Sequence, residues 1–134
     1  MKKIQPLIAV MTMLSFWASS QGKTDPVAGV WKGTSICQVK GSPCHDESVV
    51  YHITPGDSLG KYTILANKIV NGQEEEMGTI NAVYIPHTKT LSGTMPFRSD
   101  KAVWKFEVTA SEMNGTLTVE GNTLYRKVKV HRST

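Results

Sequence analysis

The stretch that decides the fold is AVWKFEVTA, residues 102–110, in which large apolar and charged side chains alternate. Successive side chains of a β-strand point to opposite faces of a sheet, so Trp104, Phe106 and Val108 share one face and the charged residues share the other. This period of two predicts a strand with one buried and one solvated face.

Similar short runs of Thr, Val, Ile and aromatic residues recur on both sides of this segment, separated by turn residues such as Pro55-Gly56-Asp57 and Asn71-Gly72. Short connections join antiparallel neighbours, and no segment has a helical period long enough for a crossover between parallel strands. We therefore predict eight antiparallel strands. They are Ala28–Cys37, Ser48–Thr54, Lys61–Ile69, Glu75–Ile85, Thr90–Met95, Ala102–Ala110, Glu112–Glu120 and Asn122–His131.

Alternation also predicts which side chains face inward. The sets are Val49, Tyr51 and Ile53; Met77, Val83 and Ile85; Trp104, Phe106 and Val108; Met113, Leu117 and Val119; and Leu124, Val128 and Val130. Eight sequential strands can remove both exposed edges by closing on themselves. The prediction is an all-β, eight-stranded antiparallel up-and-down barrel in which the first and last strands pair.

The N-terminal segment has the composition of a secretion signal. Residues 1–20 begin with two lysines, continue through an apolar run and end on small residues, and that run is too short for a permanent membrane span. We expect a signal peptide at 1–20, a flexible arm at 21–27 and one barrel domain at 28–132. A less favoured alternative packs the apolar segment into the domain as a helix. The protein is expected to be secreted or periplasmic.

Charge gives little indication of a partner. The net charge of +4 falls to +2 when the signal is removed. Lys127 and Lys129 on the last predicted strand, together with Arg132 just after it, are interpreted as its solvated side, and we expect no nucleic-acid partner.

The two cysteines, Cys37 and Cys44, are separated by six residues that include Gly41 and Pro43. In an exported protein such a pair is expected to form a disulfide, here across a hairpin tip. The alternative is a metal site formed by the cysteines with His45 and Asp46, but no second cluster completes it, so we expect no metal.

The motif Gly29-Val30-Trp31 stands at the head of the first predicted strand. It resembles the Gly-x-Trp motif of the lipocalin and calycin families, in which the Trp plugs the closed end of the barrel beneath a late basic residue. The resemblance implies a structural pair of Trp31 with Arg126, with Arg132 as the second choice. The chain also resembles, more weakly, the small periplasmic barrels that inhibit metalloproteases through an N-terminal arm, a role that residues 21–25 would fill.

The chain departs from lipocalins in being short, in lacking a C-terminal helix and in closing its disulfide within a hairpin. The triplet His45-Asp46-Glu47 is the densest polar cluster, but no motif selects a nucleophile beside it, so we expect no enzyme and no cofactor. The preferred hypothesis is a non-catalytic exported protein that binds a small apolar or amphipathic molecule. The expected ligand-binding residues are Tyr51, Met77, Trp104, Phe106 and Met113. The alternative is a protein-binding module, such as a protease inhibitor or an envelope interaction domain, that uses the arm and the loop rim.

Overall fold

The computed structural model describes residues 25–95 and 101–133. The predicted signal peptide and residues 21–24 of the predicted arm lie outside the described residues. Within the described ranges, no helix has both the length and the apolar character needed to span a bilayer.

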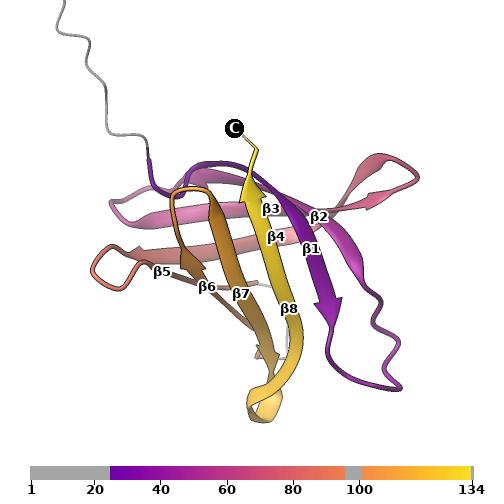
Figure 1. Cartoon of the computed structure of the whole chain (residues 1–134). Helices are drawn as coiled ribbons and strands as arrows, with labels where there is room; N and C mark the ends of the chain where they lie inside the picture. Colours follow the sequence, from indigo (N-terminus) through magenta and orange to yellow (C-terminus); the bar gives the residue numbers. More distant parts are fainter. Residues whose placement is uncertain (1–24, 96–100, 134) are drawn as a thin grey trace, which may run out of the picture.

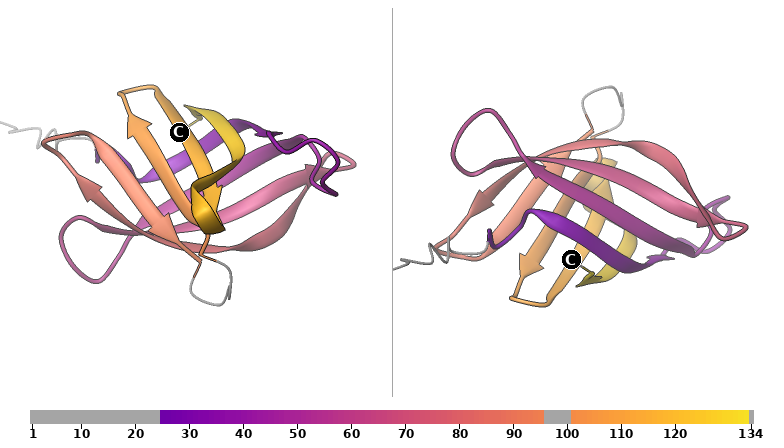
Figure 2. Two further views of the ribbon diagram at one scale, coloured as in Figure 1. Left: turned by 90° about the horizontal axis from the view of Figure 1, so that it is seen from below. Right: turned by 90° about the horizontal axis from the view of Figure 1, so that it is seen from above.

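Eight strands follow one another along the chain as an antiparallel meander, and β1 pairs with β8 to close a barrel (Figure 1). Figure 2 shows the C-terminal strands, orange to yellow, crossing the strands of the first half of the chain. The strands are β1 (Gly29–Cys37), β2 (Glu47–Pro55), β3 (Lys61–Val70), β4 (Gln73–Ile85), β5 (Thr90–Thr94), β6 (Val103–Val108), β7 (Glu112–Val119) and β8 (Thr123–Arg132), with a 3₁₀ turn, η1 (Glu120–Asn122), before β8. The predicted fold class is confirmed.

Alternation along the strands places the core inside the barrel. In β6 the odd-numbered residues are exposed, while Trp104, Phe106 and Val108 are buried. Buried inward side chains from other strands surround them, and the ring of Phe106 meets that of Tyr51 edge-on at 6.0 Å. In two segments, described next, an extra residue changes the alternation. Elsewhere the predicted inward face is confirmed for Val49, Tyr51, Ile53, Trp104, Phe106, Val108, Met113, Leu117, Val128 and Val130.

The first displaced segment is in β4, where a bulge changes which residues point inward. Ala66 of β3 pairs with Gly78, but the next residue of β3 pairs with Glu76, so Met77 has no direct partner. The extra residue reverses the alternation beyond it. The predicted inward positions of Val83 and Ile85 are therefore wrong: both are about half exposed, and Ile80 and Ala82 fill the core instead.

The second displaced segment is in β8. Leu117 of β7 pairs with Arg126, and Thr118 pairs with Leu124, so Tyr125 is the extra residue. Tyr125 packs against the core in place of the predicted Leu124.

One end of the barrel is closed by Trp31, whose side chain is fully buried. The guanidinium of Arg132 lies 4.4 Å from the centre of the Trp31 ring and donates hydrogen bonds to the carbonyls of Ala28 at 2.7 Å and Pro26 at 2.8 Å. Arg132 is thus the basic residue over the tryptophan, and the prediction of Arg126 for this position is wrong. The strand register explains the difference: Arg132 pairs with Trp31 itself, whereas Arg126 pairs with Cys37 at the other end of β1.

The segment before β1 is fixed against the same closed end. The Asp25 carboxylate accepts hydrogen bonds from the backbone amides of Val27 and Ala28 and from the Tyr62 hydroxyl, and Val27 is fully buried. Burial and the hydrogen bond to Asp25 raise the pKa of Tyr62 to about 12. Residues 25–27, predicted as the end of a flexible arm, are instead held on the barrel.

Candidate functional site

The end of the barrel opposite Trp31 contains a hollow, here called the cup, with a volume of about 420 Å³. This volume falls within the range of roughly 300–1,000 Å³ that is common for small-molecule sites. Among the described residues, it is lined by Ser35, Glu47, Tyr51, Ala66, Met77, Met95, Trp104, Leu117, Tyr125 and Arg126.

One side of the cup is apolar. Ala66, Met77, Trp104 and Leu117 come from β3, β4, β6 and β7, and Met95 follows β5 directly. Trp104 and Leu117 are almost fully buried, whereas Met77 is 37% exposed because the bulge places it at the margin. Thioether side chains adapt their shape readily, so this side can accommodate an apolar group of varied form.

The other side of the cup is polar and comes from three adjacent strands. Ser35 of β1 lies directly opposite Glu47 of β2, and Arg126 lies on the neighbouring β8. The Arg126 Nη1 atom donates to the backbone carbonyls of Ser35 at 3.3 Å and His45 at 2.9 Å. Arg126 Nη2 lies 3.6 Å from Glu47 Oε1.

Tyr51 lies between these polar groups and the core. Burial raises the pKa of its hydroxyl far above the usual value; the negative charge of Glu47 raises this pKa further, and the positive charge of Arg126 lowers it. Like an ordinary tyrosine, Tyr51 is neutral at physiological pH, and these surroundings disfavour its ionisation further.

The rim beside the polar side is fixed by the predicted disulfide. Cys37 and Cys44 are bonded, with their Cα atoms 5.9 Å apart, and this confirms the sequence expectation. The backbone amide of Cys37 also donates to Asp46 Oδ1 at 2.9 Å. Because Arg126 binds the His45 carbonyl, the same guanidinium contacts both the cup and the disulfide loop.

The structure brings together three of the five expected ligand-binding residues. Tyr51, Met77 and Trp104 line the cup, whereas Phe106 and Met113 lie in the core, 1% and 0% exposed. Sequence reasoning missed Glu47 and Arg126 as lining residues. The resemblance places Arg126 at the closed end, and the sequence gives Glu47 only as part of a polar cluster. Its position directly before the predicted strand Ser48–Thr54 is the signal that could have found it, because β2 begins at Glu47.

The triplet His45-Asp46-Glu47 does not form a single cluster of side chains in the structure. Asp46 binds the Cys37 amide, Glu47 faces Arg126, and His45 contributes its backbone carbonyl. Across residues 25–95 and 101–133, no three His, Cys, Asp or Glu side chains are arranged to hold a metal ion.

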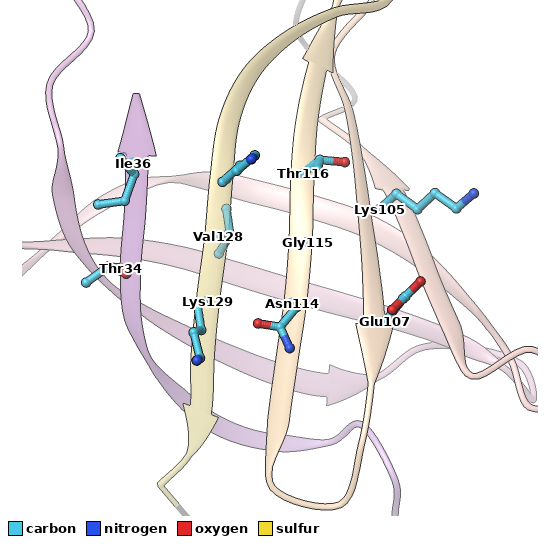
Figure 3. A pocket seen from close by; sticks show the side chains of 10 residues that line it. Thr34, Ile36, Lys105, Glu107, Asn114, Gly115, Thr116, Val128 and Lys129 are labelled. Atoms are coloured by element: carbon cyan, nitrogen blue, oxygen red, sulfur yellow. The ribbon is translucent and has the colours of Figure 1, made fainter. Parts of the chain in front are cut away.

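A larger hollow of about 650 Å³ lies on the outer face of β1, β6, β7 and β8 (Figure 3). Gly115 lies at its centre, and side chains that include Lys105, Lys127 and Lys129 surround it. Figure 3 shows the Lys105 side chain extending away from Gly115. These lysines are exposed and make no described ion pair, so this hollow has the character of a solvated outer sheet face.

The two ends of the barrel differ in what they offer a protein partner. The disulfide loop borders the cup, while Asp25 and Pro26 lie at the closed end beside Arg132. Asp25, the first described residue, therefore lies at the end opposite the cup.

No protein-family model, no curated protein and no solved structure matches this chain.

Proposed function

We propose that this protein is a non-catalytic, lipocalin-like exported protein that binds a small amphipathic molecule in the cup. The observation that supports this proposal best is the division of the cup into an apolar side and a polar side. The apolar part of the ligand would lie against Trp104, Leu117, Met77 and Met95, and the polar end of the ligand would face Arg126 and Glu47.

The closed barrel and the disulfide fit this role. Disulfides form and persist in oxidising compartments, as expected for a secreted or periplasmic protein. The closed end is plugged by Trp31 and tied to the segment before β1, so the cup is approached from the disulfide-loop end.

The test is titration of the purified protein with N-phenyl-1-naphthylamine, a neutral apolar fluorophore, followed by the gain in the fluorescence of the probe on direct excitation. Ala66 is buried and lines the cup, so Ala66→Trp fills the space and is expected to weaken binding at least tenfold. Lys105→Trp is the matched control, because it adds the same side chain beside the outer hollow. It is expected to leave binding unchanged.

Met77→Trp provides a second obstruction at the exposed margin of the cup, where a larger side chain strains the core less than at Ala66. Circular dichroism and thermal melting confirm that each variant is folded. The proposal fails if the probe does not bind, if binding survives both cup variants, or if Lys105→Trp abolishes it.

A further inference from the structure

The polar side of the cup holds two opposite charges that face each other without a hydrogen bond. Arg126 Nη2 and Glu47 Oε1 are 3.6 Å apart, beyond the usual limit of about 3.2 Å for an N–H···O bond. The side chains are only 12% and 22% exposed. Each charge therefore keeps capacity for a polar partner in a place where water is scarce.

The orientation of Arg126 leaves a particular edge available. Its three hydrogen bonds to described residues, to the carbonyl and hydroxyl of Ser35 and to the carbonyl of His45, all come from Nη1. Nε and Nη2 make no hydrogen bond to a described residue, and only the Glu47 carboxylate lies near Nη2, so the edge that they form carries two parallel N–H donors for a ligand. This is the arrangement that matches the two oxygens of a carboxylate.

A ligand with one charge would satisfy only half of this site. A carboxylate at Arg126 would also lie beside the Glu47 carboxylate, and an ammonium group at Glu47 would lie beside the guanidinium. Like charges at this distance repel, and burial strengthens the repulsion. A ligand that has both groups satisfies each protein charge and leaves the net charge of the site unchanged.

The short distance between the two protein charges limits how far apart the ligand charges can be. Charge-assisted hydrogen bonds are about 2.7–2.9 Å long, so two such bonds to groups 3.6 Å apart require an ammonium and a carboxylate that are themselves adjacent. An α-amino acid has this geometry, because both groups are attached to one carbon atom.

We infer that the cup binds molecules with an α-amino-acid head and an apolar side chain, the carboxylate on Arg126 and the ammonium group on Glu47. The side chain extends toward Met77, Trp104 and Leu117. This inference rests on the proposed function and names its ligand class.

The experiment is isothermal titration calorimetry at pH 7 with four ligands that share an eight-carbon skeleton: L-2-aminooctanoate, octanoate, octylammonium and 1-octanol. The amino acid is expected to bind at least tenfold tighter than each of the others. N-acetylation and methyl esterification of 2-aminooctanoate remove one charge at a time, and each is expected to cost at least tenfold in affinity. These comparisons need no protein variant.

Glu47→Gln gives a sharper test, because it removes the partner of the ammonium group and the repulsion of a carboxylate together. The preference is expected to reverse in this variant, so that octanoate binds more tightly than 2-aminooctanoate. Glu107→Gln, an exposed position beside the outer hollow, is the matched control and is expected to keep the original order.

Two results would overturn the inference: affinity for 1-octanol equal to that for the amino acid, or an unchanged order of ligands in Glu47→Gln. In both cases, binding of N-phenyl-1-naphthylamine that is sensitive to Ala66→Trp would leave the proposed function intact. If neither the four ligands nor the fluorophore bind, both proposals are refuted.

Discussion

Replacing Arg132 with alanine is expected to destabilise the barrel substantially. The guanidinium stacks on Trp31 and forms two short hydrogen bonds to the carbonyls of Ala28 and Pro26. A cation over an aromatic ring contributes about 0.5–2 kcal/mol. A hydrogen bond from a charged group contributes about 1.5–3 kcal/mol when its partner is desolvated. Because water can replace part of these contacts, we expect a total loss of about 2–4 kcal/mol.

That loss is a large fraction of the roughly 5–15 kcal/mol that keeps a domain folded. The free energy of unfolding would be measured by urea titration followed by circular dichroism at pH 7. A drop in melting temperature of at least about 8 °C should accompany it, given about 4 °C or more per kcal/mol for a domain of this size. Arg132→Lys keeps a positive charge but loses the planar fork, so we expect an intermediate loss.

The matched control is Lys129→Ala, on the same strand but on the outer face. It should change the free energy of unfolding by no more than about 0.5 kcal/mol. If Arg132→Ala were as mild as this control, the proposed role of the stack and its two hydrogen bonds would be refuted.

Three further predictions concern other contacts. Burial raises the pKa of Asp25, but hydrogen bonds from the amides of Ala28 and Val27 and from the Tyr62 hydroxyl, with the charge of Arg132, lower it below the ordinary value of 3.8. The ionised carboxylate therefore stabilises the folded protein above pH 3.8, and this stabilisation is lost as the pH falls through the lower pKa of the folded state. Asp25→Asn should therefore lose less stability than the parent between pH 4 and pH 2 in urea titrations; equal losses would contradict this. Gly115→Ala places a methyl group against the buried Phe106 ring and the backbone carbonyl of Lys105, and should cost about 1–3 kcal/mol in the same assay; a neutral result would contradict this close approach. Replacing both Cys37 and Cys44 with serine should cost about 2–3 kcal/mol, because the bond closes only a short loop, and an unchanged urea midpoint would argue against it.

The fold was predictable because its signal is local. The alternation around Trp104 and Phe106 gives β6 one buried face, and similar alternation marks other strands. Short turns between consecutive strands require antiparallel pairing. Closure followed because the strands were sequential. None of these steps needs a contact between distant residues to be known in advance.

The errors arose where one extra residue changes the alternation. Met77 is the unpaired residue of a bulge in β4, and counting by twos across it put Val83 on the wrong face. The exchange of Arg126 for Arg132 has a related origin, since which basic residue lies over Trp31 depends on the register between β1 and β8. Register between strands at opposite ends of the chain is set by the whole barrel and leaves no trace in a short stretch of sequence.

The seam between β1 and β8 also determines when folding can finish. The hydrogen bond from Arg132 to Ala28 joins residues 104 positions apart, so the barrel cannot close until nearly all of the chain is available. Forming such distant contacts late makes folding slow. Any intermediate without β8 in place presents the free edges of β1 and β7, and such edges readily pair with those of other molecules. Refolding yield should consequently fall as protein concentration rises, even though β1 and β8 are paired with each other in the finished barrel.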